Sequence, residues 1–156
     1  MSDEIRPDPS LYASFLQLVE IDRIEFLRIA AERTPTLVEV REGRVDVDAK
    51  PRLESLDTDS LSAVVDVSVR GNTGKKQVFT CQMQVRAVYR ITNNKPGISD
   101  RQDLAAFFSK TNVLVNVWPY LRHAVSYITT ILGVGTVTLG LLKPHRTEPD
   151  DERSEQ

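Results

Sequence analysis

Residues 61–91 read LSAVVDVSVRGNTGKKQVFTCQMQVRAVYRI, and this stretch decides the fold. Apolar and polar residues alternate along both of its halves, with Val64 as the one exception in the first half. A period of two is typical of a strand with one buried face. Gly71-Asn72-Thr73-Gly74 lies between the halves and tolerates positive φ, so the stretch predicts a β-hairpin.

Two further strands are predicted upstream of this hairpin. Apolar residues from about Phe15 to Ile29 indicate a long first strand, with a bulge near residues 20–23 where the alternating face changes. Residues 36–48 indicate a shorter second strand, which Gly43 can interrupt. The four strands together predict an antiparallel meander with one polar face.

Downstream of Ile91 the apolar period becomes that of a helix. Ser99 and Asp100 are both good N-caps, and residues 100–132 are predicted to be helical, in two pieces or with a kink at Pro119. The apolar stripe covers most of the helix circumference, so we expect a second subunit to cover the side that the sheet cannot. The candidate interface residues are Val117, Trp118, Tyr120, Leu121, Val125 and Ile128.

The segment after this helix, residues 133–142, reads GVGTVTLGLL and carries no charge. Either another subunit covers it or it is exposed for binding. Residues 1–10 and 145–156 are polar and are expected to be flexible tails around one domain, residues 11–144. The predicted class is α+β, a twisted four-stranded antiparallel sheet followed by a long helix in an oligomer.

Composition limits the classes of function. The 156 residues are 40% hydrophobic and 27% charged, which indicates one globular domain. A formal net charge of −2 lacks the basic footprint of a nucleic-acid binder, and no apolar run of about 20 residues predicts membrane insertion. The single cysteine and the polar N-terminus, without a secretion signal, predict a cytoplasmic location.

The sequence offers no constellation of catalytic residues. The two histidines, His123 and His145, are isolated, and Cys81 lies on the apolar face of a predicted strand. Metal sites need three or four clustered ligands, and the glycines at 133 and 135 form no phosphate-binding motif. We therefore expect no catalytic residue, no metal, no cofactor and no enzymatic activity.

The helix and the segment after it resemble one known family. Trp118-Pro119-Tyr120-Leu121-Arg122, then Gly135-Thr136 and Leu142-Lys143-Pro144, resemble the aromatic-Pro-Tyr-x-Arg helix, Gly-Thr segment and closing proline of the SecB export chaperones. Residues 79–91 are also similar to that family's fourth strand. The likeness extends from about residue 15 to residue 144.

The resemblance implies a SecB-like fold, assembled as a homotetramer that is a dimer of dimers. It also implies an ATP-independent holdase, which keeps unfolded or nascent polypeptide in exposed apolar grooves. The residues that we expect to line the client groove are Phe26, Val38, Val40, Val134, Val137, Leu139, Leu141 and Leu142.

The chain departs from the family pattern in three places. His123 replaces a usual Glu, and no second C-terminal helix is expected after Pro144. The resemblance aligns Arg23, Leu27 and Gln82 with three acids that dock the SecA motor and Thr80 with a leucine there, so SecA binding is in doubt.

These departures leave several functions open. Within the family, protein export stands beside a chaperone dedicated to a toxin–antitoxin pair, whose client is the antitoxin. Outside it, a small apolar-ligand-binding module and a purely structural oligomer remain as alternatives.

Overall fold

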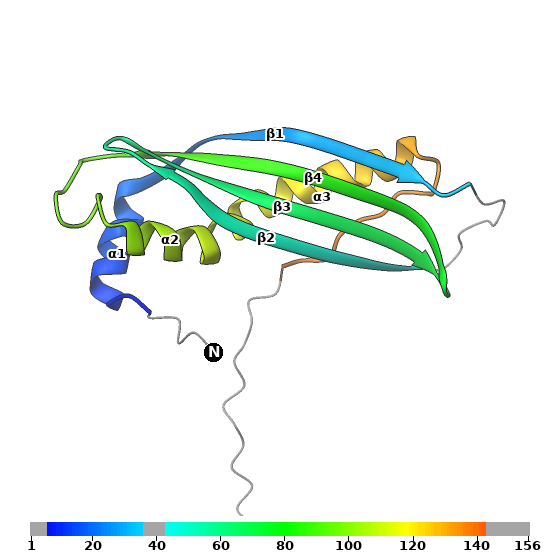
Figure 1. Cartoon of the computed structure of the whole chain (residues 1–156), viewed down its shortest axis with the longest axis horizontal. Helices are drawn as coiled ribbons and strands as arrows, with labels where there is room; N and C mark the ends of the chain where they lie inside the picture. The colour runs from blue at the N-terminus through cyan, green and yellow to red at the C-terminus, as the bar shows by residue number, and fades with distance from the viewer. Residues whose placement is uncertain (1–5, 36–42, 143–156) are drawn as a thin grey trace, which may run out of the picture.

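A four-stranded antiparallel sheet is covered on one face by helices in this computed structural model, which describes residues 6–35 and 43–142 (Figure 1). The strands are β1 (Val19–Arg33), β2 (Arg44–Leu56), β3 (Ser60–Thr73) and β4 (Lys76–Ile91). The helices are α1 (Pro9–Leu18), α2 (Gln102–Thr111) and α3 (Val113–Ile131). The predicted α+β class, a four-stranded sheet followed by a long helix, is confirmed.

The strand order is β1-β4-β3-β2, so the predicted four-strand meander is wrong. Strands β2, β3 and β4 follow one another as a meander, but β1 lies beside β4, with Phe26 opposite Val85. Alternation along a strand reports which face is buried and not which strand is its neighbour. As a result β1 and β2 form the two edges of the sheet. Residues 36–42 of the predicted strand 36–48 lie outside the described residues. Strand β2 extends beyond the predicted end of that strand, to Leu56.

The β3–β4 hairpin is confirmed, and its turn lies at the end of the predicted stretch of residues 71–74. Gly74, at φ 60°, and Lys75 form the turn. Gly71 instead lies within β3 opposite Phe79, where an added Cβ would stand 2.1 Å from the ring. A glycine is therefore needed at position 71 for close packing, and the positive φ of the turn falls on Gly74.

Strand β1 contains two bulges, of which only the first was predicted. The register shifts between Ile21 and Arg23, and again between Phe26 and Arg28. Each bulge adds one residue that has no partner in β4, so apolar residues three positions apart return to the same face. Ile21, Phe26 and Ile29 all oppose core residues of β4 for this reason.

Residues 9–18 form a helix, where the sequence pattern predicted a tail and the start of a strand. The Asp8 carboxylate accepts hydrogen bonds from the main-chain N–H of Ser10 (2.9 Å) and Leu11 (3.0 Å), and Pro9 occupies the first helical turn. Both are helix-start signals, so the sequence did carry the information. Phe15 and Leu18 on this helix are buried.

The long helical region is in two pieces, and the break is at Asn112 and not at Pro119. The Asn112 side chain accepts hydrogen bonds from Tyr12 and Thr111, while Pro119 lies inside α3. Neither Ser99 nor Asp100 caps α2, whose N-cap is Arg101. Ser99 and Asp100 bond within the preceding loop instead, Asp100 accepting from the Gly97 N–H at 2.8 Å.

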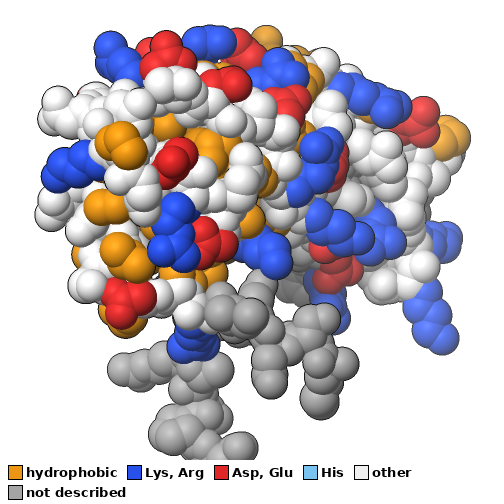
Figure 2. Space-filling view, turned by 60° about the vertical axis from the view of Figure 1, so that its left-hand side comes forward, with side chains coloured by type: hydrophobic (Ala, Val, Ile, Leu, Met, Phe, Trp, Pro, Cys, Tyr) orange, Lys and Arg blue, Asp and Glu red, His pale blue; other side chains and the backbone are white. Residues whose placement is uncertain are grey.

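The two faces of the sheet differ in chemistry. The face toward the helices carries the core, which includes Val65, Val85 and Tyr89 together with Val117 and Leu121 of α3. The outer face is charged in both signs, and Figure 2 shows Lys and Arg side chains interspersed with Asp and Glu over one side of the molecule. Helices therefore cover only one of the two faces.

A network centred on Arg86 crosses the outer face. Its guanidinium donates to both oxygens of Glu54, at 2.6 and 2.7 Å, and to Glu25 at 3.3 Å. These bonds lower the pKa of Glu54, with Arg86 as the main cause, and raise the pKa of Arg86. The network joins three strands, β1, β2 and β4, across the outer face.

Candidate functional site

The segment 133–142 returns along α3 on the helix side of the sheet (Figure 1, orange trace). It leaves the helix through a Schellman turn, in which Val134 N–H donates to the Thr129 carbonyl (3.2 Å) and Gly133 N–H to the Thr130 carbonyl (3.1 Å). Gly133 and Gly135 have φ values of 69° and 88°, which other residues rarely adopt. These glycines allow the chain to reverse direction directly after the helix.

Side chains of α3 hold the segment in place by bonding to its main chain. The Thr129 hydroxyl accepts from Val137 N–H (3.0 Å), and Arg122 donates to the Leu139 carbonyl (2.8 Å). Trp118 Nε1 donates to the Gly140 carbonyl at 2.9 Å. The segment has no regular secondary structure, so these bonds replace the partners that a strand or helix would supply.

Arg33, the last residue of β1, anchors the start of the segment. Its guanidinium donates to the main-chain oxygens of Leu132 (3.1 Å) and Gly133 (2.9 Å). A cation beside the carbonyls at a helix C-terminus is favourable. Sequence patterns do not reveal this residue, because the two partners are 99 and 100 residues away along the chain.

The residues predicted to line the client groove differ in their exposure. Leu139 is buried and belongs to the hydrophobic core, while Val134, Val137 and Leu142 are half-buried. Leu141 is 76% exposed. Val38 and Val40 lie outside the described residues.

Strand β1 adds apolar surface of which the sequence pattern predicted only Phe26. Phe26 is 36% exposed, Ile21 46% and Ile29 50%, although all three are on the face that the helices cover elsewhere. Leu27, at the second bulge, is also exposed. The sequence does contain a signal for this surface, the three-residue spacing from Ile21 to Ile24 and from Phe26 to Ile29. Such a spacing places two residues of a strand on the same face where a bulge lies between them, so the signal can be interpreted only when both bulges are known.

Helix α3 has a buried side and an outer side. Of the predicted interface residues, Val117, Leu121 and Val125 lie in the core of the single chain, Trp118 and Ile128 are half-buried, and Tyr120 is exposed. The large apolar residues on the outer side are Val115, Tyr120, Tyr127 and Ile131. These four residues are the most exposed large apolar side chains that α3 offers to a second molecule.

A cavity of about 290 Å³ lies between the segment and the end of the sheet. Its apolar lining includes Val45, Val78, Phe79, Val134 and Val137. The residues that line the cavity come from β2, β3, β4 and the segment 133–142. The cavity therefore lies where this segment meets the end of the sheet.

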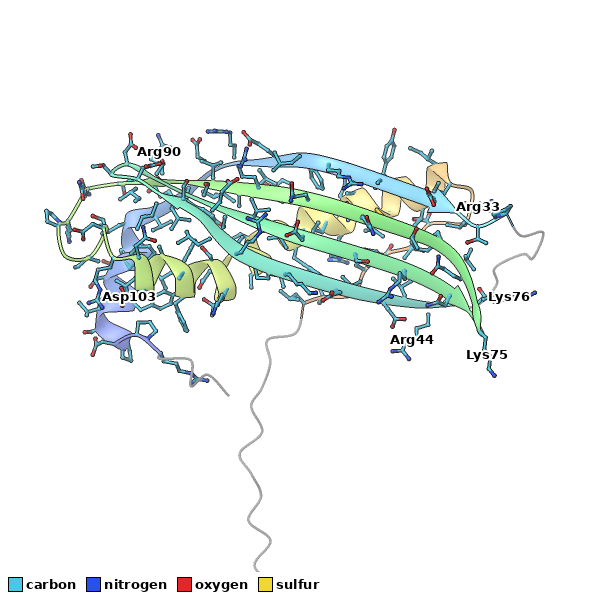
Figure 3. All side chains as sticks on the ribbon, in the orientation of Figure 1. Arg33, Arg44, Lys75, Lys76, Arg90 and Asp103 are labelled. Atoms are coloured by element: carbon cyan, nitrogen blue, oxygen red, sulfur yellow. The ribbon has the colours of Figure 1, made fainter. Side chains whose placement is uncertain are left out.

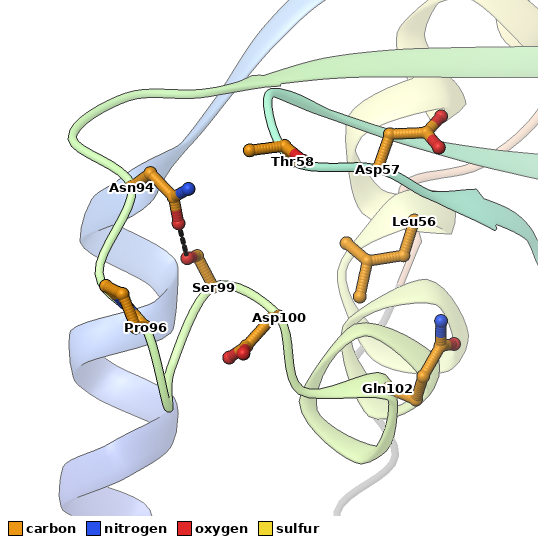
Figure 4. A pocket seen from close by; sticks show the side chains of 8 residues that line it. All are labelled: Leu56, Asp57, Thr58, Asn94, Pro96, Ser99, Asp100 and Gln102. Atoms are coloured by element: carbon orange, nitrogen blue, oxygen red, sulfur yellow. Dashed lines mark hydrogen bonds between the residues drawn. The ribbon is translucent and has the colours of Figure 1, made fainter.

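A second cavity, of about 440 Å³, is polar and lies between the β2–β3 turn and the loop before α2 (Figure 4). Asp57, Thr58 and Asp100 are among its lining residues. The Asn94 side chain accepts a hydrogen bond from Ser99 within the loop, so these polar groups hold the loop together. The cavity is separate from the apolar surface.

The cysteine and the histidines of the sequence lie in different surroundings. Cys81 is buried in the core, and burial raises the pKa of its thiol, which disfavours the nucleophilic thiolate. His123 is exposed on α3, and His145 lies outside the described residues. Within residues 6–35 and 43–142, no three His, Cys, Asp or Glu side chains cluster as metal ligands, and no helix is long and apolar enough to cross a membrane.

The positions that the resemblance aligns with the SecA-docking residues carry no carboxylate themselves. Arg23 pairs with Asp22 (2.8 Å) and Glu25 (2.7 Å), and Thr80 and Gln82 lie on the outer face of β4. Leu27 is exposed at the second bulge of β1.

Comparison with known proteins identifies the fold. No family model matches the chain, and no curated protein matches it in sequence. Among solved structures, the Mycobacterium tuberculosis Rv1957 SecB-like chaperone, in complex with a ChAD peptide from the Rv1956 HigA1 antitoxin, superposes with a TM-score of 0.76 at 17% identity. That match covers 88% of this chain and 99% of the other.

A Streptococcus agalactiae protein of unknown function also matches, with a TM-score of 0.44 at 14% identity over 79% of this chain and 97% of the other. The order of strands, the helices on one face and the match to Rv1957 agree with the resemblance found in the sequence. The chain has the SecB-like fold.

Proposed function

We propose that this chain is an ATP-independent chaperone that holds unfolded polypeptide on the helix side of its sheet. The observation that carries the proposal is the row of exposed apolar side chains on β1, Ile21, Phe26 and Ile29, in a SecB-like fold. Exposed apolar rows of this kind mark binding sites in folded proteins. Several shallow apolar contacts along an extended chain give affinity without strict sequence specificity.

The proposed client is an antitoxin, so the chain would serve one toxin–antitoxin pair. The SecB-like neighbour was solved with an antitoxin peptide, which supports this class of client. Arg23, Leu27 and Gln82 in place of docking acids disfavour a dedicated role in SecA-dependent export. Export remains the second role within the same proposal, since it uses the same apolar surface.

The proposed assembly is a homotetramer formed as a dimer of dimers. Tyr120, Tyr127 and Ile131 on the outer side of α3 are large, apolar and exposed in the single chain. A second α3 packed on this side would bury them. The half-buried Trp118 and Ile128 are expected at the margin of that contact.

The test is suppression of aggregation of a chemically unfolded protein, without nucleotide. A chaperone lowers light scattering at stoichiometric concentration, whereas a purely structural oligomer does not. A fluorescent hydrophobic dye on the native protein provides the second readout, because a module with one closed ligand pocket binds the dye at a single site and leaves scattering unchanged. Unchanged scattering together with a stable oligomer would contradict the chaperone proposal.

A further inference from the structure

Several cations lie at the end of the molecule that holds the apolar cavity. Figure 3 shows Arg33, Arg44, Lys75 and Lys76 at the same end of the molecule, with Arg90 and Asp103 at the opposite end. Arg44 lines the cavity itself, and Lys76 lies opposite Thr73, which also lines it. Arg33 bonds to Gly133, next to the lining residue Val134.

Few described acids offset this charge. Arg44 pairs with Asp46 at 2.8 Å, so that cation is partly neutralised. Arg33 faces the negative end of helix α3 through its bonds to two carbonyls. For Lys75 and Lys76 the described residues supply no carboxylate partner. These two lysines, in and directly after the β3–β4 turn, therefore add positive charge beside the lining residue Thr73.

One residue of the cavity lining, Thr73, has a polar atom without a partner. Its hydroxyl oxygen is buried and accepts or donates no hydrogen bond in the described part of the chain. A buried hydroxyl without a partner is costly, so a rotation of this side chain toward an entering peptide main chain would be favourable. The site thus combines apolar walls, one unpartnered hydroxyl in its lining and positive charge at the neighbouring turn.

We infer that the apolar cavity at this end of the sheet selects extended polypeptide segments in which large apolar side chains are flanked by Asp or Glu. The apolar side chain would fill the 290 Å³ cavity between Val78, Phe79 and Val137, and the flanking carboxylates would lie near Lys75 and Lys76. Charge complementarity at a rim sets specificity and association rate more than total affinity. The inference rests on the proposed function, and adds to it the chemical class of the client.

The test compares three labelled peptides that share one apolar centre and carry acidic, neutral or basic flanks. Fluorescence anisotropy with the full chain should rank the acidic peptide first, and the ranking should weaken as salt rises from about 50 mM to about 500 mM. The double variant K75E/K76E should reverse the ranking and weaken the acidic peptide roughly five- to tenfold. The double variant R90E/K95E changes the net charge equally at the other end and should leave the ranking intact.

Each outcome separates this inference from the function on which it rests. Equal binding of all three peptides, or a ranking that K75E/K76E does not change, overturns the acidic preference while the chaperone function stands. Binding of none of the peptides, with no suppression of aggregation, overturns both. Should K75E/K76E fail to fold by circular dichroism, the single variant Lys75→Glu in the exposed turn and the wild-type salt series decide between the same outcomes.

Discussion

Arg122 and Leu139 are joined by a 2.8 Å hydrogen bond from the guanidinium to the main-chain oxygen. Trp118, one helical turn earlier, bonds in the same way to the next residue, Gly140. Side chains four positions apart lie on one side of a helix, so two successive carbonyls of the segment are held by a single side of α3. This explains how a segment without charge or regular structure keeps Leu139 inward and Leu141 outward.

Replacing Arg122 by Met should loosen this segment. The change keeps an apolar stem but leaves the Leu139 carbonyl without its donor, which costs about 1–3 kcal/mol for a buried acceptor. We expect a lower thermal midpoint and faster hydrogen exchange over residues 137–142. The neighbouring variant His123→Met is the control, since His123 is exposed and should change stability by less than about 0.5 kcal/mol. Equal exchange in both variants would show that packing alone holds the segment.

The two sides of α3 predict different outcomes for the same substitution. Leu121 is fully buried, so Leu121→Asp places an uncompensated charge in the core and should unfold the chain, at a cost of several kcal/mol. Tyr127 is 64% exposed, so Tyr127→Asp should leave the fold intact. If the outer side of α3 forms the proposed oligomer, Tyr127→Asp should instead reduce the size of the assembly.

Circular dichroism and light scattering after size exclusion distinguish these outcomes. A folded Tyr127→Asp variant with the same mass as the wild type would contradict an interface on the outer side of α3. A wild-type chain that is monomeric at micromolar concentration would contradict the oligomer altogether.

The Arg86 network should make stability depend on pH in the acid range. Arg86 lowers the pKa of Glu54 below its ordinary 4.5, so the ionised form is favoured in the folded chain. This contribution is present above the ordinary pKa and is lost as the pH falls through the lowered value. Glu54→Gln should therefore lower the urea midpoint at pH 7, and the difference from wild type should shrink as the solution is acidified. Glu20→Gln is the control, because the described residues supply no ion pair to Glu20.

Much of the fold could be predicted from local patterns, while its connections could not. The alternation in residues 61–91 and the helical period after residue 100 are local, and both strands and the helical region are present in the structure. The pairing of β1 with β4 and the contact of Arg33 with Gly133 join residues far apart in sequence, so no local period reports them. The predicted turn stretch included Gly74, where the turn lies, but it began too early, because only the position of Phe79 shows why Gly71 belongs to the strand.

The candidate site was predicted less completely than the fold. Leu141 and Phe26 are exposed apolar residues, as expected, but the sequence could not tell them from Leu139, which is also apolar and is buried. Ile21 and Ile29 were missed because the second bulge hides their shared face. Exposure depends on what lies opposite a residue, and this is set by tertiary packing.

SecA should not bind this chain tightly. The aligned docking positions carry Arg23, Thr80 and Gln82, and Arg23 is already paired with Asp22 and Glu25. Without acids at the aligned positions, the basic, zinc-bearing tail of the motor loses the charge attraction that the docking acids would supply. Calorimetric titration of that tail should give no measurable heat. Tight, salt-sensitive binding would show that other acids of the outer face, such as Glu32 or Asp66, form the docking site.

Removing exposed apolar side chains should weaken client protection and leave the fold unchanged. Ile29 on β1 and Leu141 after α3 are 50% and 76% exposed, so Ile29→Ser with Leu141→Ser removes little of the core. Burying one such side chain fully against a client is worth roughly 1.5–3 kcal/mol, and a shallow contact is worth less. We expect several-fold more chaperone to be needed to suppress aggregation, with the thermal midpoint nearly unchanged. The control Leu139→Ser should instead lower that midpoint, because Leu139 is in the core. If the double variant loses its oligomeric state, these residues form an interface, and if it protects clients at wild-type strength, the client surface lies elsewhere.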